Sequence, residues 1–200
     1  MRADEFPEQL CQALLPAISE CASKLAAEPM GQVYAFCIYC ASGCQSITIA
    51  AQTLTALAEQ NAKAEGDTRQ TLVNTVGAME WEHAFVDPRL FSQADSLVDS
   101  FYDTLYDGEF EDVSFDDDVS SAQLQDFAYD RFMPAFVEAI RRSRQSGVFA
   151  AKAFANDVLL GVQFADPYGG NWDLMENASA SVNSPEWHRQ FKAYCDLGRG

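Results

Sequence analysis

The chain has 200 residues, of which 48% are hydrophobic, and it carries 30 Asp and Glu residues against 13 Lys and Arg residues. A chain of this length can bury about 70% of the surface that it exposes when unfolded, so we expect one folded domain over residues 1–200 and exclude global disorder. The formal net charge of −17 opposes direct binding to nucleic-acid phosphates and to anionic lipid headgroups. It favours fast association with basic proteins.

The N-terminal segment and the cysteines indicate the compartment in which the protein works. Residues 1–8 carry acids where an export signal carries Lys or Arg, and no stretch approaches the roughly 18 consecutive apolar residues that span a bilayer. Six cysteines in a chain of this length without an export signal are typical of reduced, buried thiols. We therefore expect a cytoplasmic protein without membrane contact, and we favour a monomer.

The N-terminal part of the chain predicts two helices and three strands. Apolar residues recur at three- and four-residue spacing over 7–27, which predicts an amphipathic helix with a proline inside it. Residues 33–40 are apolar on both alternating faces and residues 45–50 alternate polar with apolar, so together they predict a β-hairpin with a buried first strand. A polar helix over 53–64 follows, and the β-branched content of 71–76 favours a third strand.

The rest of the chain predicts further helices and one more strand. An apolar stripe over 94–105 and a longer one over 124–140 each predict a helix, and an acidic loop over 107–119 connects them. Residues 157–165 have the apolar content of a buried strand, and Ser184 is a typical N-cap of a last helix. Helices interleaved with strands and a hairpin predict an α+β fold, with an antiparallel or mixed sheet of about four to five strands packed against several helices.

Two short motifs have spacings that resemble metal sites. Cys37, Cys40 and Cys44 are spaced like zinc or iron–sulfur ligands, but residues three apart on a strand point to opposite faces and no second cysteine pair completes four ligands. Glu80 and His83 have the Glu-x-x-His spacing of dimetal sites, which need that motif twice. The chain also lacks a nucleophile elbow and a phosphate-binding glycine loop. We therefore predict no metal, no cofactor and no catalytic residue.

The distribution of charge is the strongest signal in the sequence. Between Arg89 and Arg131 the chain has no Lys or Arg but 12 of its 30 acids. Aspartates recur every four residues along the predicted helix there, so their carboxylates lie on one face and repel one another. Such a run is either a solvated face that maintains solubility or a surface that fills a cationic cleft of a partner. The candidate partner-binding residues are Asp95, Asp99, Asp103, Asp107, Glu109, Glu111, Asp112, Asp116, Asp117 and Asp118.

Three segments of the chain carry a family resemblance. They are the strand Tyr34-Ala35-Phe36-Cys37-Ile38-Tyr39, the pair Glu80-Trp81 and the late segment Ser181-Val182-Asn183. This set resembles a bacterial family defined only as domain of unknown function 4303. Members of that family tend to carry Asp and Gly after the last strand tyrosine, whereas this chain has Cys40-Ala41-Ser42-Gly43-Cys44. The resemblance implies a cytoplasmic bacterial protein of the kind encoded beside secreted or contact-dependent toxins.

Charge and resemblance together favour an immunity protein. Such an inhibitor must meet a basic, nuclease-like toxin quickly and tightly, and it needs no catalytic residues of its own. Our leading hypothesis is therefore a cytoplasmic acidic protein-binding domain that neutralises a bacterial toxin by covering the active cleft of the toxin. The alternative hypothesis is an enzyme or a small-ligand-binding domain with a site near Glu80, Trp81 and His83, which a pocket at those side chains would favour.

Overall fold

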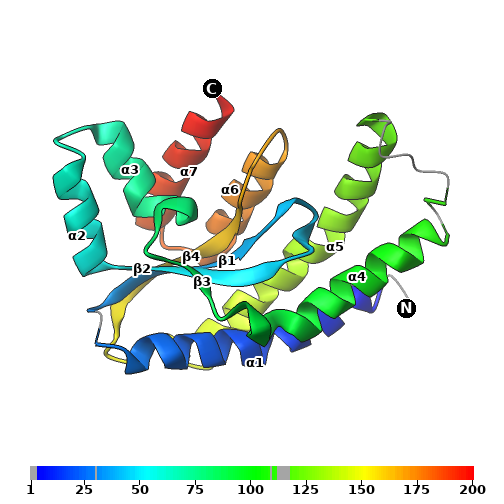
Figure 1. Ribbon diagram of the computed structural model, residues 1–200, viewed down its shortest axis with the longest axis horizontal. Helices are drawn as coiled ribbons and strands as arrows, with labels where there is room; N and C mark the ends of the chain where they lie inside the picture. Colours follow the sequence, from blue (N-terminus) through cyan, green and yellow to red (C-terminus); the bar gives the residue numbers. More distant parts are fainter. Residues whose placement is uncertain (1–3, 30, 109, 112–117) are drawn as a thin grey trace.

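The computed structural model describes residues 4–29, 31–108, 110–111 and 118–200, which form three layers (Figure 1). Within these residues, a four-stranded mixed sheet in the order β3-β2-β1-β4 lies between seven α-helices. The predicted α+β class and a mixed sheet are therefore confirmed. Among the described helices, none combines the length and the apolar content needed to cross a membrane.

The bounds of the elements follow in chain order. The helices and strands are α1 (Phe6–Ala27), β1 (Val33–Cys40), β2 (Ile47–Thr53), α2 (Leu54–Lys63), α3 (Thr68–Val76), β3 (His83–Val86), α4 (Ser92–Tyr106), α5 (Asp118–Gln145), β4 (Phe154–Phe164), α6 (Asn171–Val182) and α7 (Pro185–Arg199). Short 3₁₀ turns lie at η1 (Ser42–Cys44), η2 (Ala78–Glu80) and η3 (Pro88–Phe91).

The sheet is covered on both faces. β1 pairs antiparallel with β2 and parallel with β4, and β2 pairs antiparallel with β3. Helices α1, α4 and α5 lie on one side of the sheet, and α2, α3, α6 and α7 lie on the other (Figure 1). Every residue of β1 and β2 is buried, which confirms the hairpin with a buried first strand. The polar residues of β2, Thr48, Gln52 and Thr53, are buried as well, so the alternation of polar and apolar residues does not mark a solvent-exposed face.

An aromatic cluster joins the three helices on the α1 side. The ring of Phe6 on α1 stacks on that of Phe101 on α4, with 4.3 Å between centroids, and lies 5.3 Å from that of Phe132 on α5. Phe101 and Phe132 also meet edge to face at 5.5 Å. All three rings are almost completely buried, so each helix has one face fixed toward the core and the opposite face is presented to solvent.

The predicted strand over 71–76 is wrong, because these residues form the C-terminal part of α3. The carboxylate of Asp67 accepts hydrogen bonds from the backbone N–H groups of Arg69 and Gln70 and so caps the helix. The hydroxyl groups of Thr71 and Thr75 donate to carbonyls one turn earlier. The cap outweighs the β-branched character of the segment.

Three other parts of the chain differ from the sequence prediction or extend it. β3 and α6 were not predicted as a strand and a helix. Helix α5 begins at Asp118, six residues before the predicted apolar stripe. Most of the predicted acidic loop over 107–119 lies outside the described residues, apart from its two ends.

Candidate functional site

Exposed acids on α4 and just beyond it form the first candidate site. Asp99, Asp103 and Asp107 are exposed and follow one another at four-residue spacing along the helix and its C-cap. Glu111 is exposed a few residues later. We call these four residues the acidic face. The opposite side of α4 is buried, so the helix is fixed in one orientation and the aspartates point away from the core.

Two hydrogen bonds hold α4 against the β1–β2 turn. The Tyr102 hydroxyl donates to the carbonyl oxygen of Gly43 at 2.9 Å. The Asp95 carboxylate accepts the backbone N–H of Ile47, the first residue of β2, also at 2.9 Å. Gly43 has a φ of +81°, a left-handed conformation that glycine adopts without strain. The turn and α4 therefore form one rigid support for the acidic face.

Asp95 is in a different environment from the other aspartates of α4. Its carboxyl group is partly buried, and this burial raises its pKa, while the hydrogen bond from the Ile47 N–H lowers it and the charge of Asp99 raises it further. Asp95 therefore serves first as an acceptor that fixes the start of β2. Among the predicted partner-binding residues on α4, it is the least accessible to a partner.

The acidic face has no basic neighbour that neutralises it among the described residues, where no ion pair reaches Asp99, Asp103 or Asp107. The first base after the acidic run is Arg131, whose guanidinium lies 3.7 Å above the ring of Phe127 and donates to the Phe127 carbonyl at 3.1 Å. This arginine is therefore held on α5 by a cation–π contact and a backbone bond. Within the part of the chain that the structure describes, the exposed carboxylates of α4 therefore have no compensating base.

The C-terminal end of α4 is an unfavourable position for carboxylates. Asp103 lies in the last turn, Asp107 is the C-cap, and that turn contains no basic residue. The C-terminal end of a helix carries partial negative charge, so an acid there costs about 0.3–1 kcal/mol. Like charges at four-residue spacing add about 0.2–0.5 kcal/mol for each pair. The arrangement lowers the stability of the helix that carries it.

The remaining predicted partner-binding residues fall at the edge of the structure. Asp118 is the first residue of α5. The others lie outside the described residues: Glu109, Asp112, Asp116 and Asp117. Of the predicted partner-binding residues, those whose exposure the structure describes are the aspartates of α4 and its C-cap, and Glu111.

The residues of the alternative site do not gather in one place. Trp81 is only 3% exposed and belongs to the hydrophobic core. Glu80 is exposed at the end of η2, and His83 is the first residue of β3. Because the 3₁₀ turn ends at Glu80, that carboxylate and the His83 imidazole do not share a helical face, as their spacing had suggested. Of these three residues, His83 lines a pocket at the end of α1.

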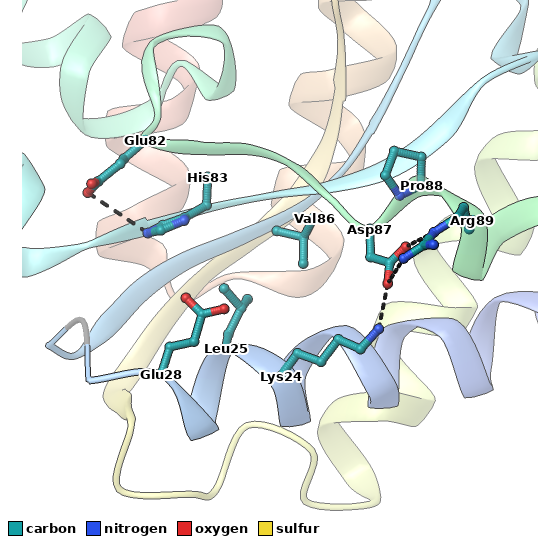
Figure 2. A pocket seen from close by; sticks show the side chains of 9 residues that line it. All are labelled: Lys24, Leu25, Glu28, Glu82, His83, Val86, Asp87, Pro88 and Arg89. Atoms are coloured by element: carbon teal, nitrogen blue, oxygen red, sulfur yellow. Dashed lines mark hydrogen bonds and ion pairs between the residues drawn. The ribbon is translucent and has the colours of Figure 1, made fainter.

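Figure 2 shows this pocket, which has a volume of about 750 Å³ and lies between the end of α1 and the segment from β3 to η3. The Asp87 carboxylate accepts a hydrogen bond from Lys24 at 2.5 Å and another from Arg89 Nε at 3.0 Å. The bond from Arg89, and then that from Lys24, lowers the pKa of Asp87 to about 2. At the other end of the pocket, His83 Nε2 lies 3.8 Å from the Glu82 carboxylate.

The charged network of the pocket has a structural role. Asp87 has a φ of +38°, which is strained for a residue with a side chain, and its bonds to α1 and η3 hold it there. The network fastens the end of β3 to α1, and the other polar side chains that line the pocket are His83, Glu28 and Glu82. Sequence reasoning missed Lys24 and Asp87, because 63 positions separate them and neither has a local signal beyond the Asp-Pro step.

The predicted burial of the cysteines is confirmed. All six are buried and free of disulfide bonds. The sulfur of Cys40 lies 3.7 Å from that of Cys44, and Cys37 accepts a weak hydrogen bond from Gln163. Burial raises the pKa of the Cys37 thiol to about 12 and also raises that of Cys44, so the reactive thiolate is disfavoured. Among the described side chains, no group of three His, Cys, Asp or Glu residues could hold a metal ion.

Comparison with known proteins places the chain in a family. The family model DUF4303, whose description is "domain of unknown function", matches residues 14–180. The match covers most of the chain, so the protein belongs to the DUF4303 family. No curated protein and no solved structure matches it. Membership in this family assigns no activity, and any function must be argued from the sites themselves.

The segments on which the family resemblance rests have structural roles. The Tyr34 hydroxyl donates to the carbonyl of Thr75 at 2.8 Å and so ties β1 to α3. The amide of Asn183, three residues beyond the family match, accepts the Leu160 N–H at 2.8 Å and donates to the Leu160 carbonyl at 2.7 Å. This pair of bonds satisfies the backbone of the edge strand β4. These contacts give Tyr34 and Asn183 a role in folding.

Proposed function

We propose that the protein is a protein-binding domain whose acidic face binds a basic partner. The observation that carries this proposal is the placement of Asp99, Asp103 and Asp107 on α4, where each charge lowers the stability of the helix and no described base compensates it. Solubility alone requires negative charge somewhere on the surface, but not at the end of a helix where it costs most. Departures from local stability rules are expected at functional sites.

The most specific form of this proposal is a cytoplasmic immunity protein. It would neutralise a basic, nuclease-like bacterial toxin by covering the toxin's active cleft with the acidic face. Complementary charge speeds the encounter and excludes partners of the wrong sign, and the net charge of −17 extends this steering beyond the contact itself. The inhibitor contributes charge and shape, so its function requires no catalytic side chain.

The test is capture of a partner from the native cell lysate at low and at high salt, followed by mass spectrometry. We expect a stoichiometric basic protein that is released at roughly 0.5 M salt, because screening weakens interactions between exposed charges. The double variant Asp99→Asn and Asp103→Asn should bind this partner at least about tenfold more weakly.

The matched control removes the same charge from a distant surface. Glu59 on α2 and Glu65 in the following turn are both exposed, and the variant Glu59→Gln with Glu65→Gln should retain full capture. Equal losses in the two variants would mean that net charge alone matters. Failure to recover any basic protein at low salt would refute the proposal.

The pocket in Figure 2 supports a second candidate function, the binding of a small ligand. The observation in its favour is His83, whose Nε2 is buried without a hydrogen-bond partner among the described residues although its ring lines a cavity of about 750 Å³. A cavity of this size is within the range of ligand sites. A library of small polar molecules, screened by NMR, should give ligands whose binding is lost in His83→Ala; hits that bind both proteins equally would exclude this site.

A further inference from the structure

A groove between α5 and the turn before α6 lies apart from both candidate sites. It has a volume of about 480 Å³, which is within the range of sites that enclose a small ligand or a side chain. One wall comes from α5 through Gln125, Asp126, Tyr129 and Asp130, and the other comes from the turn over 168–171.

Tyr168 forms an aromatic rim of this groove. It is 53% exposed, which is unusual for a large aromatic side chain in this molecule. Its hydroxyl donates to Gln125 Oε1 at 2.5 Å, and its backbone N–H donates to Asn171 Oδ1 at 3.2 Å. Because both the ring and the backbone are held, the ring is presented to solvent in a fixed position. Aromatic side chains that are ordered before binding are common anchors of protein interfaces.

The α5 side of the groove supplies two carboxylates. Asp126 and Asp130 are exposed at four-residue spacing, so they lie on one face of the helix. Arg131 lies 4.0 Å from Asp130, but its guanidinium is held over the ring of Phe127 at 3.7 Å. The groove thus combines negative charge with an exposed aromatic ring.

The turn leaves room for a close approach. A Cβ atom placed on Gly169 or Gly170 would meet nothing within 4 Å, so a group that enters the groove can reach the backbone there. Gly169 has a φ of +48°, a left-handed conformation that glycine adopts readily. Glycine at this position therefore sets the shape of the turn and keeps one side of the groove open.

We propose that this groove receives an arginine side chain of a basic protein partner, an inference that rests on the function proposed above. A planar guanidinium can stack on the Tyr168 ring while its N–H groups donate to the carboxylates of Asp126 and Asp130. In this arrangement, the acidic face on α4 attracts the partner over a distance, and the groove holds one residue of it in a defined geometry. The two sites lie on α4 and α5, which pack against each other through Phe101 and Phe132.

The test is an NMR titration of the ¹⁵N-labelled full chain with N-acetyl-arginine amide, a probe that needs no knowledge of the partner. Saturable shifts should concentrate on residues 125–130 and 168–174. The amide of N-acetyl-citrulline, which has almost the same shape without the charge, should give much smaller shifts. Tyr168→Leu and the double variant Asp126→Asn with Asp130→Asn should each weaken arginine binding about tenfold.

The variant Glu59→Gln with Glu65→Gln is the matched control, since it removes two exposed carboxylates that do not line the groove. It should leave the affinity for the arginine probe unchanged. Uniform shifts over all acidic segments, or equal weakening in the control, would overturn the groove as a site. Capture of a partner that depends on Asp99 and Asp103 but not on Asp126 and Asp130 would remove the groove and retain the function proposed for α4. If the groove binds the arginine probe but capture of the partner does not depend on Asp99 and Asp103, the groove is retained as a site and the function proposed for α4 is refuted.

Discussion

Helices α4 and α7 have the same length, 15 residues each, but their charges are arranged in opposite ways. α7 has Ser184 as a side-chain N-cap and ends with Arg199. α4 has no side-chain N-cap, and Asp103 and Asp107 lie at its C-terminal end. Because this end of a helix carries partial negative charge, the arginine stabilises α7 and the two aspartates destabilise α4.

The surroundings of the two helices extend the contrast. Arg199 donates to Asp173, Glu176 and Asp196, each at 2.7 Å, and so joins α7 to α6. In the described part of the chain, α4 has no such partner for its exposed acids. The chain has 13 bases for 30 acids, and it uses several of them where they hold helices together. The charges of α7 are therefore arranged to stabilise the fold, whereas those of α4 are not.

The largest expected effect comes from breaking the α7 network. Arg199→Ala removes three ion pairs at once and leaves the mostly buried Glu176 without its arginine, so we expect a loss of about 1–2 kcal/mol in the free energy of unfolding. Urea denaturation at low salt measures it. Arg189→Ala is the control, because Arg189 is exposed and, among the described residues, pairs only with Glu186. Similar losses in both variants would show that the network contributes nothing beyond a surface pair.

The N-cap of α7 should give the next largest effect. The Ser184 hydroxyl accepts the Trp187 N–H at 3.4 Å and donates to the Asp157 carboxylate at 2.7 Å, so Ser184→Ala should cost about 1 kcal/mol. Ser92→Ala at the start of α4 should change the stability by only a few tenths of a kcal/mol, since no side-chain cap is formed there. A loss at Ser92 as large as that at Ser184 would contradict the difference between the two helices.

Neutralising one acid on α4 and one on α7 should change the free energy of unfolding by smaller amounts, and in opposite directions. Asp103→Asn should raise the free energy of unfolding by about 0.5 kcal/mol, because it removes repulsion by Asp99 and Asp107 and the unfavourable interaction with the helix end. Asp196→Asn should lower it by about as much, since Asp196 bonds to Arg199 and Lys192. Thermal and urea unfolding of the two variants measure the difference. If Asp103→Asn destabilises the protein, the charge of Asp103 does not lower the stability of α4, and the argument for the acidic face fails.

The sequence predicted best those features that depend on neighbours along the chain. The buried strand at 33–40, the long helix around Phe132 and Phe136 and the cap at Ser184 follow from local periodicity and cap chemistry. The four-residue spacing of the aspartates likewise predicted that they share one face of α4. At 71–76, local signals competed, and the Asp67 cap decided in favour of a helix.

Features that depend on distant contacts could not be predicted in this way. β3 has four residues, and it is a strand only because it pairs with β2 at Ile49 and Ala51. The inward position of Asp95 depends on the free N–H of Ile47, 48 residues away. For the same reason, the pocket between Lys24 and Asp87 has no local signature. Sequence patterns predict which residues share a helix face, whereas tertiary packing determines which polar groups on that face form buried hydrogen bonds.

The last prediction concerns the sign of the pH dependence in the two regions. Hydrogen bonding from Lys192 lowers the pKa of Glu176, so its contribution to stability is present above the pKa of the unfolded chain and is lost as the pH falls through the lowered value. Burial raises the pKa of Asp95, so its contribution is present at low pH and is lost as the pH rises through the raised value. Glu176→Gln should therefore be less stable than the wild type at pH 7, and Asp95→Asn, which keeps an acceptor for Ile47, more stable.

Both differences should shrink as the pH falls toward about 3, where the carboxyl groups become protonated. Urea midpoints of the wild type and the two variants between pH 3 and pH 7 measure them. Asp95→Ala separates charge from hydrogen bonding, because it lacks the charge, as Asp95→Asn does, but leaves the Ile47 N–H unpaired. Relative to Asp95→Asn it should cost about 1–3 kcal/mol at every pH. If Asp95→Asn were less stable than the wild type at pH 7, the charge of Asp95 would stabilise the fold. The argument that α4 carries its carboxylates at the expense of stability would then apply only to the exposed ones.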